Sequence, residues 1–160
     1  MTGILPIIYQ EGGIELLDTI APLWRKLTIH HAGISTHFHD HFLGLRWDER
    51  KDGLVERSRN GGVHNVLAKI AAEDRYVGYC IGAIDKQKNA DIESLFVEDD
   101  FRGGGIGTEM VRRMIVWMDG NGAVCKTVSV AVGNEKAYRF YEQFGFLPRL
   151  TVLQQEEKKM

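Results

Sequence analysis

The 160-residue chain has few cysteines, few prolines and no long apolar run. Its two cysteines, Cys80 and Cys125, lie in apolar, strand-like segments without a C-x-x-C spacing, which favours reduced core thiols over a disulfide framework. The apolar run near the amino terminus, Ile4 to Ile8, follows no basic region and is too short for a signal peptide or a membrane span. The default expectation is therefore a cytoplasmic protein.

The chain also lacks an excess of charge of either sign. Its 20 basic and 22 acidic residues leave a formal net charge of −2 at pH 7. No strong long-range field would draw it to nucleic acid or to an anionic membrane, so we expect neither as a partner. With 160 residues and 44% hydrophobic content, the chain is long enough for one domain with a full core and short for two.

The spacing of apolar residues predicts a mixed α/β order of elements. In chain order these are a strand at 4–9, a helix at 14–27, a helix at 35–45, a loop or frayed helix end at 48–62, strands at 63–70, 76–84 and 92–97, a helix at 108–118, a strand at 127–132, a helix at 134–144 and a strand at 147–153. Pro6 suits an edge strand, and Pro22 is expected to kink or split the first helix. Three consecutive strands joined by tight turns predict an antiparallel meander. The strand at 127–132 follows a helical crossover and is expected to be central and parallel to its predecessor.

The most informative segment is dense in glycine and stands between a predicted strand and a predicted helix. It reads Arg102-Gly103-Gly104-Gly105-Ile106-Gly107. Glycines remove the Cβ atoms that would keep a ligand from backbone N–H groups, and the positive end of a helix dipole favours a phosphate there. A dinucleotide fold would need a glycine where Met110 stands, and a P-loop would need lysine and then serine or threonine where the chain has Thr108 and Glu109. What remains is a phosphate-binding loop with the pattern Arg-x-x-Gly-x-Gly.

A second motif follows at 134–146 and has the form N-x-x-A-x-x-x-Y-x-x-x-G-F. Its fixed positions are Asn134, Ala137, Tyr141, Gly145 and Phe146. Together with the glycine loop before it, this motif resembles the GNAT superfamily of N-acetyltransferases. The resemblance covers about residues 63–153, whereas residues 1–62 match only in their outline of a strand followed by helices.

The resemblance implies an α/β (α+β) GNAT fold, with a mixed, mostly antiparallel sheet, helices on both faces and a splayed central pair of strands. Residues 1–160 would form one domain, in which 1–62 hold the acceptor-side helices, 63–153 the CoA-binding core and 154–160 a polar tail. The implied reaction is transfer of an acetyl group from acetyl-CoA to a primary amine by direct attack in a ternary complex. Direct attack agrees with the lack of a histidine near either cysteine in the sequence.

The same resemblance implies which residues hold CoA. Pantetheine would pair with the exposed backbone of Leu95, Phe96 and Val97, as an added strand does. The diphosphate would lie on the N–H groups of Arg102, Gly103, Gly104, Gly105, Ile106 and Gly107, with Thr108 extending the group. For Arg102, a phosphate contact and a solvated loop position are both open. For Asn134, a pantetheine contact, a helix cap or both are open, and Tyr138 completes the cofactor-binding set.

Tyr141 occupies the position that the family uses for the acid that protonates the departing thiolate. The pKa of that thiol should lie near ~8.5 and the pKa of a tyrosine lies near ~10, so a tyrosine can hydrogen-bond the sulfur and return a proton to it. Tyr138, one turn earlier, is a weaker substitute. The alternative for Tyr141 is a plain core aromatic.

A base is needed as well, because an alkylammonium with a pKa near ~10 must lose its proton before attack. Strand period two predicts that Asp91, Glu93, Leu95 and Val97 share one face. Relatives often carry a glutamate eleven positions before the Arg or Gln of the glycine loop, where this chain has Asp91. We prefer Glu93, acting directly or through a water, with Asp91 second. A solvated or ion-paired carboxylate and a base made of ordered water are the alternatives.

Five of the six histidines gather in one region, at His30, His31, His37, His39 and His41. His37 and His41 would share a helix face at i,i+4, but no H-E-x-x-H arrangement is present, and no metal is expected. We expect instead that residues 28–62 cover the acceptor site. Its apolar walls would be Trp24, Phe38, Phe42 and Trp47.

Two other functions stay open: a non-catalytic acyl-CoA binding or sensing module on the same fold, and a nucleotide-binding module. The acceptor could be a small molecule or a peptide, because specificity in the superfamily lies in variable N-terminal helices. Polyamines, amino acids, antibiotics, peptide N-termini and lysine side chains all stay open. A homodimer is compatible with the family, but no segment of the sequence indicates an interface.

Overall fold

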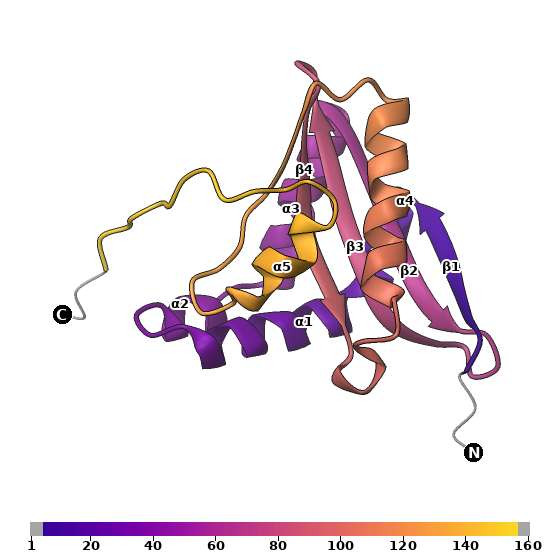
Figure 1. Cartoon of the computed structure of the whole chain (residues 1–160), viewed down its shortest axis with the longest axis horizontal. Helices are drawn as coiled ribbons and strands as arrows, with labels where there is room; N and C mark the ends of the chain where they lie inside the picture. The colour runs from indigo at the N-terminus through magenta and orange to yellow at the C-terminus, as the bar shows by residue number, and fades with distance from the viewer. Residues whose placement is uncertain (1–4, 157–160) are drawn as a thin grey trace.

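The computed structural model describes residues 5–156, whose strands form one five-stranded sheet in the order β1-β2-β3-β4-β5 (Figure 1). The strands are β1 (Ile7–Gly12), β2 (Gly61–Ile70), β3 (Arg75–Asp85), β4 (Asn89–Val97) and β5 (Cys125–Val128). Neighbours from β1 to β4 are antiparallel, and β5 is parallel to β4 because the helix α4 (Ile106–Gly120) connects them. The predicted mixed, mostly antiparallel sheet is confirmed.

Helices cover both faces of this sheet (Figure 1). They are η1 (Ile14–Leu16), α1 (Leu17–Ile34), α2 (His39–Leu43), α3 (Trp47–Arg59), η2 (Asp99–Phe101), α4 and α5 (Lys136–Glu142). On one face α4 buries Met110, Met114 and Met118 against the sheet. On the other face α1 and α3 bury side chains that include Ile20 and Leu54. Each face of the sheet therefore has its own apolar core.

Two predictions about the N-terminal helices, a split at Pro22 and a loop over 48–62, are wrong. The helix α1 runs unbroken from Leu17 to Ile34, so Pro22 does not split it. Buried Ile20 and Leu23 on either side of the proline tie this part of the helix to the core. The segment 48–62, predicted as a loop or frayed end, is largely the helix α3. Leu54 is the one buried residue of α3 within the described chain, so the sequence has too little apolar periodicity to reveal the helix.

The C-terminal third also differs from its prediction. The strand expected at 127–132 ends at Val128 and lies at the edge of the sheet rather than in its centre. The segment 147–153, predicted as a strand, pairs with no strand of the described chain. Cys125 is exposed rather than part of the core, whereas Cys80 is buried as expected. β5 is therefore an edge strand with a neighbour on one side only.

The first strand begins at Ile7 instead of residue 4 and lies at a sheet edge, as Pro6 suggested. Residue 4 of the predicted strand and residues 157–160 of the predicted tail lie outside the described residues. Within 5–156, none of the helices combines the length and the apolar character that a membrane crossing requires.

Candidate active site

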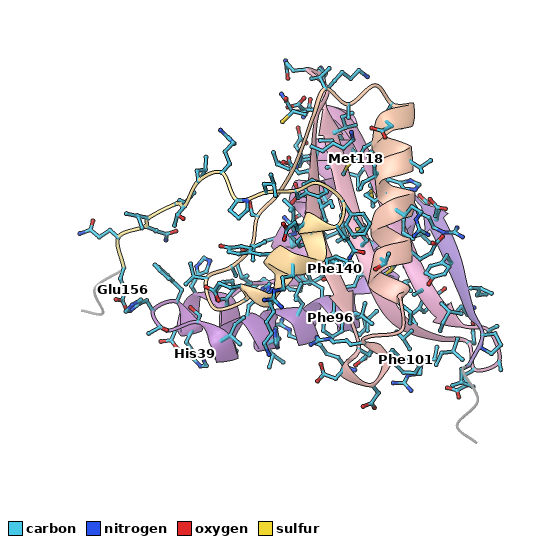
Figure 2. The ribbon with its side chains drawn as sticks, viewed as in Figure 1. His39, Phe96, Phe101, Met118, Phe140 and Glu156 are labelled. Carbon is cyan, nitrogen blue, oxygen red and sulfur yellow. The ribbon has the colours of Figure 1, made fainter. Side chains whose placement is uncertain are left out.

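A cavity of about 1160 Å³ opens between β4, the glycine loop, α5 and the helices α1 to α3. Phe96 from β4, Phe101 from η2 and Phe140 from α5 line it and are labelled in Figure 2. The predicted site residues that line it are Glu93, Leu95, Phe96, Val97, Arg102, Gly103, Gly105, Ile106, Gly107, Thr108, Asn134 and Tyr141. Asp91, Gly104 and Tyr138 are not among the lining residues. One continuous space thus joins the loop predicted to bind phosphate to the N-terminal helices.

The cavity begins where β4 and β5 separate. Their parallel register runs from Asn89 opposite Cys125 to Ile92 opposite Val128 and then stops. Beyond that point β4 continues to Val97 with β3 as its strand partner, while residues 129–131 line the other side of the cavity. The edge of β4 that faces the cavity is therefore open to an added extended chain, because no strand in residues 5–156 pairs with it.

A β-bulge in β4 lies at this branch point. Ile81 of β3 pairs with Ser94 and Gly82 pairs with Ile92, so Glu93 is the extra residue. The bulge breaks the alternation along the strand. Leu95 packs against the core under α4, together with Val97, and on the other side of the bulge Asp91 and Glu93 point to α3. The prediction that these four residues share one face is wrong, because the inserted residue shifts the period.

The glycine loop presents a run of unpaired amides. Gly103 has φ +79° and Gly105 has φ +88°, a left-handed conformation that glycine adopts without strain. Within the described chain, no hydrogen-bond acceptor is paired with the backbone N–H groups of residues 103–108. A Cβ on Gly103 or Gly105 would meet no atom within 4 Å, so space is open beside both. These amides lie at the positive end of the 15-residue helix α4, where they could hold an anion.

The side chain of Arg102 folds back over the end of β4. Its Nε donates a hydrogen bond to the Val97 carbonyl at 2.9 Å, and its Nη1 lies 3.1 Å from the Asp99 carboxylate. The guanidinium carbon lies 5.7 Å from the centre of the Phe96 ring. Arg102 therefore satisfies the carbonyl of Val97, the last residue of β4, and contributes positive charge at the mouth of the cavity.

Tyr141 on α5 faces the cavity from a largely buried position, with 8% of the residue exposed. Its ring packs against Phe140 at 5.0 Å and Phe146 at 6.0 Å, measured between centroids. Burial raises the pKa of Tyr141 above its usual range, and nearby Cys80 adds to the effect. The phenol therefore stays protonated, and its hydroxyl has no hydrogen-bond partner in residues 5–156. It is free to donate a hydrogen bond into the cavity.

Asn134 and Tyr138 are the other two predicted site residues of this motif, and their surroundings differ from those of Tyr141. The carbonyl of Asn134 accepts a hydrogen bond from the Ala137 N–H at 3.0 Å, but its side chain makes no cap, and α5 begins only at Lys136. The predicted side-chain cap is therefore wrong, and the Asn134 amide lines the cavity instead. Tyr138 is 43% exposed.

The far end of the cavity is formed by α1, α2 and α3. Trp24, Phe42 and Leu45 provide apolar surface there. Trp47 packs against Trp24 with ring centroids 5.3 Å apart, but neither Trp47 nor Phe38 is a lining residue. The helices of segment 28–62 therefore do cover this end, with a smaller set of aromatic side chains than predicted.

Two histidines of the cluster, His30 and His31, line this end of the cavity. Burial lowers the pKa of His31, and the charge of His30 adds to the effect. His37 precedes α2, so the predicted i,i+4 pair with His41 on one helix face does not form. Among residues 5–156, no group of three or more His, Cys, Asp or Glu side chains is arranged to hold a metal ion.

The two predicted carboxylates are held by arginines of α3. Arg50 donates to one oxygen of Glu93 at 2.8 Å, and Arg57 pairs with the other. Arg57 also donates to Asp91 at 3.1 Å, and the Thr127 hydroxyl donates to that carboxylate as well. The charged donors at this distance engage the lone pairs of both carboxylates. Neither arginine was predicted as a site residue, because both belong to α3, which the sequence pattern indicated as a loop or frayed helix end.

Ser94, next to the bulge, is a further residue of the cavity that the sequence did not predict. Its hydroxyl lines the cavity and lies 2.7 Å from the hydroxyl of fully buried Tyr79. Burial raises the pKa of Tyr79 above its usual range, so the pair is uncharged. In the sequence, the position of Ser94 beside Glu93 could have indicated a place in the site. Its side chain reaches the cavity only because of the bulge.

Comparisons with known proteins agree with this geometry. A model of the acetyltransferase (GNAT) family matches residues 28–146. A stretch of 66 residues is 38% identical to an uncharacterized N-acetyltransferase of Methanocaldococcus jannaschii; it makes up 41% of this chain and 29% of that protein, so the chain spans less than a third of that relative's length.

Solved structures share the fold at low sequence identity. A GCN5-related N-acetyltransferase from Ralstonia eutropha JMP134 has a TM-score of 0.73 at 15% identity, over 94% of this chain and 98% of that one. The aminoglycoside N-acetyltransferase AAC(6')-Iy, in complex with CoA, has a TM-score of 0.67 at 14% identity, over 99% of both chains. Because the family model spans most of the sequence and includes both motifs, the chain belongs to the acetyltransferase (GNAT) family.

Proposed function

We propose that the protein transfers the acetyl group of acetyl-CoA to a primary amine by direct attack in a ternary complex. One observation carries the proposal: the unpaired amides of the glycine loop, the open edge of β4 and the Tyr141 hydroxyl all border one cavity. An anion site, an open strand edge and a proton donor in that order match the diphosphate, pantetheine and thioester of acetyl-CoA.

The residues of the site fit CoA. The amides of residues 103–108 would hold the diphosphate, with the dipole of α4 adding to the attraction. The open edge of β4 from Leu95 to Val97 would pair with pantetheine, whose amides can act as those of an added strand. The Asn134 side chain, which lines the cavity and caps no helix, would hold the same arm.

The thioester supplies an activated acetyl group and a thiolate leaving group. Tyr141 is the proposed donor to that sulfur, since its raised pKa keeps the phenol protonated through the working pH range. Neither cysteine suits a covalent acetyl carrier. Cys80 is fully buried and burial raises its pKa to about 12, and Cys125 does not line the cavity. Both facts support direct attack by the amine.

For the base, the contacts favour His31 over Glu93. Both oxygens of Glu93 are engaged by guanidinium groups, so their lone pairs are not free to accept a proton from the acceptor amine. His31 lines the acceptor end, and its lowered pKa leaves the imidazole neutral and able to accept a proton near neutral pH. Glu93 and Asp91 would then fix the shape of the bulge, so we assign them a positioning role.

The proposal is tested by following thiol release from acetyl-CoA with a panel of amines and detecting the acetylated product by mass spectrometry. The panel should contain a polyamine, free amino acids, an aminoglycoside, a peptide with a free N-terminus and a lysine peptide. We expect thiol release that depends on one class of amine. Tight CoA binding without release from any amine would instead favour the non-catalytic acyl-CoA module, and stabilisation by ATP or NAD but not by CoA would favour a nucleotide-binding module.

A further inference from the structure

One face of α3 borders the acceptor end of the cavity. Its lining residues follow one another at helical spacing, and they are Arg46, Glu49, Arg50 and Gly53. From this face Arg50 reaches across to Glu93 in the bulge of β4. The face therefore looks onto the part of the cavity where the bulge opens β4.

Glu49 carries the unmatched carboxylate of this end. Glu49 and Glu93 are the acidic side chains among the described residues that line the cavity, and Glu93 is held by two arginines. Within residues 5–156, no hydrogen bond or ion pair joins the Glu49 carboxylate to another side chain. The Glu49 carboxylate can therefore accept a hydrogen bond from a bound ligand.

The cations of this face already have partners. Asp48 binds the Arg46 guanidinium at 2.8 and 3.1 Å and raises its pKa, and the charge of Glu49 adds to that effect without an ion pair. Arg50 is engaged by Glu93 at 2.8 Å. A ligand with a positive group would therefore find an open partner here in Glu49, whereas a ligand with a carboxylate would meet two arginines that are already engaged.

Gly53, one turn after Glu49, leaves open space on the same face. A glycine inside a helix is less stable than an alanine there, because more backbone freedom is lost on folding. The backbone of Gly53 is helical without positive φ, and a Cβ would meet no atom within 4 Å. Neither backbone conformation nor close packing thus requires this glycine. Its missing side chain leaves room for a ligand beside Glu49.

We propose that Glu49 and the space beside Gly53 form a subsite for a second cationic group of the acceptor. The acceptor would then be a diamine, with one amine that reacts and one ammonium that stays charged at the far end of an apolar stem. The stem would pass the apolar side chains at this end, which are Trp24, Leu27, Phe42 and Leu45. An aminoglycoside also carries several charges, but its polar rings do not suit these walls. The inference rests on the proposed function only for the fate of the reacting amine.

Three probes that differ only in their tail test the subsite. They are diaminobutane, aminobutanol and aminobutyrate, whose tails are positive, neutral and negative on the same carbon chain. Their affinities are measured by calorimetry, on protein with and without CoA. We expect wild type to bind the diamine about tenfold more tightly than the amino alcohol, and aminobutyrate most weakly. Tenfold is the low end for a hydrogen bond to a charged group, because Glu49 is exposed.

The variant Glu49→Gln should reduce the preference for diamine over amino alcohol to about one. Its matched control is Asp52→Asn, which removes the same charge from the same helix at a position that does not line the cavity. Asp52→Asn should keep the preference of wild type. Equal affinities for diamine and amino alcohol in wild type, tighter binding of aminobutyrate, or a preference that persists in Glu49→Gln would overturn the proposal.

The space beside Gly53 has its own test. Gly53→Leu fills that space with a good helix former, and we expect the affinity for the diamine to fall about tenfold or more. Gly33→Leu is the control, because Gly33 lies within α1, a Cβ there also meets no atom within 4 Å, and it does not line the cavity. Circular dichroism should show the same fold in both variants. Equal diamine affinity in wild type and Gly53→Leu would contradict the subsite.

These binding measurements do not depend on turnover. A diamine that binds through Glu49 but is not acetylated would leave the subsite standing and refute the proposed transfer. Acetylation of amines with no dependence on Glu49 would support the transfer and refute the subsite.

Discussion

Replacing Gly105 by alanine tests the glycine loop at a position where the backbone has positive φ. Gly105 has φ 88° and ψ 2°, and an alanine in this left-handed region costs about 1–2 kcal/mol. The new Cβ meets no atom within 4 Å, so no steric clash adds to that cost. For a chain of this length, 1 kcal/mol corresponds to a change of about 2–4 °C in Tm. We therefore expect Gly105→Ala to lower Tm by about 2–8 °C.

The matched control is Gly122→Ala, at the opposite end of α4. Gly122 has φ +77°, and a Cβ there also meets no atom within 4 Å, so the backbone strain is the same in kind and similar in size. Gly122 lies in the turn before β5 and does not line the cavity. The two variants should lose similar amounts of thermal stability in the absence of ligand, and only one of them changes the proposed phosphate site.

Isothermal calorimetry with CoA then separates the variants. The Cβ on Gly105 enters the open space beside the loop amides, where it would displace a bound diphosphate. Losing one hydrogen bond to a charged oxygen costs about 1.5–3 kcal/mol, which corresponds to a Kd about ten to a hundred times higher. Gly122→Ala should bind CoA as wild type does. Equal affinity in all three proteins would refute the assignment of the loop amides to the diphosphate.

Three further predictions concern the chemistry and the bulge. Tyr141→Phe is expected to lower kcat about a hundredfold while the calorimetric Kd for CoA stays unchanged; a variant with full kcat would leave Tyr141 a core aromatic only. Because the pKa of His31 is lowered, kcat/KM should fall only below about pH 6.5, as the imidazole takes up a proton. This fall of kcat/KM at low pH should disappear in His31→Asn and persist in Glu93→Gln. The reverse result would mean that Glu93, not His31, is the base. Arg57→Leu should lower the free energy of unfolding in urea by about 1–3 kcal/mol, since it leaves two partly buried carboxylates with fewer partners. Arg59→Leu, whose ion pair is exposed, should change it by less than about 0.5 kcal/mol, and equal losses would contradict a structural role for Arg57.

The glycine loop and α4 could be predicted from the sequence because their signals are local. Gly103 and Gly105 stand where the backbone needs positive φ, and the apolar residues of α4 recur at helical spacing directly after them. The motif around Tyr141 is local in the same way. The antiparallel meander of β2, β3 and β4 followed from short strands and tight turns between them. Each of these features depends on residues within one or two turns of each other.

The parts that the sequence did not reveal depend on contacts between distant segments. The helix α3 has little apolar surface, and its arginines find their partners on β4, more than thirty positions away. The bulge at Glu93 arises from how β3 and β4 pair, which no pattern within β4 encodes. The end of β5 at Val128 follows from that same bulge, because β4 turns away from residues that otherwise read as a strand.

The two ends of the cavity, one at the glycine loop and one at the helices α1 to α3, are built from different kinds of groups. Glu93 is the residue that connects them. The end that we propose for CoA is built from backbone amides and a strand edge, which require glycine and open geometry rather than particular side chains. The acceptor end is built from side chains of α1 to α3. Glu93 belongs to both, because the arginines of α3 hold it in the bulge that opens β4 towards the cavity. Apart from His31, the proposed base, substitutions on the cavity face of α1 and α2 should then alter the choice of acceptor alone. Substitutions at Arg50 or Arg57 should also weaken CoA binding, since they act on the bulge that opens the strand edge.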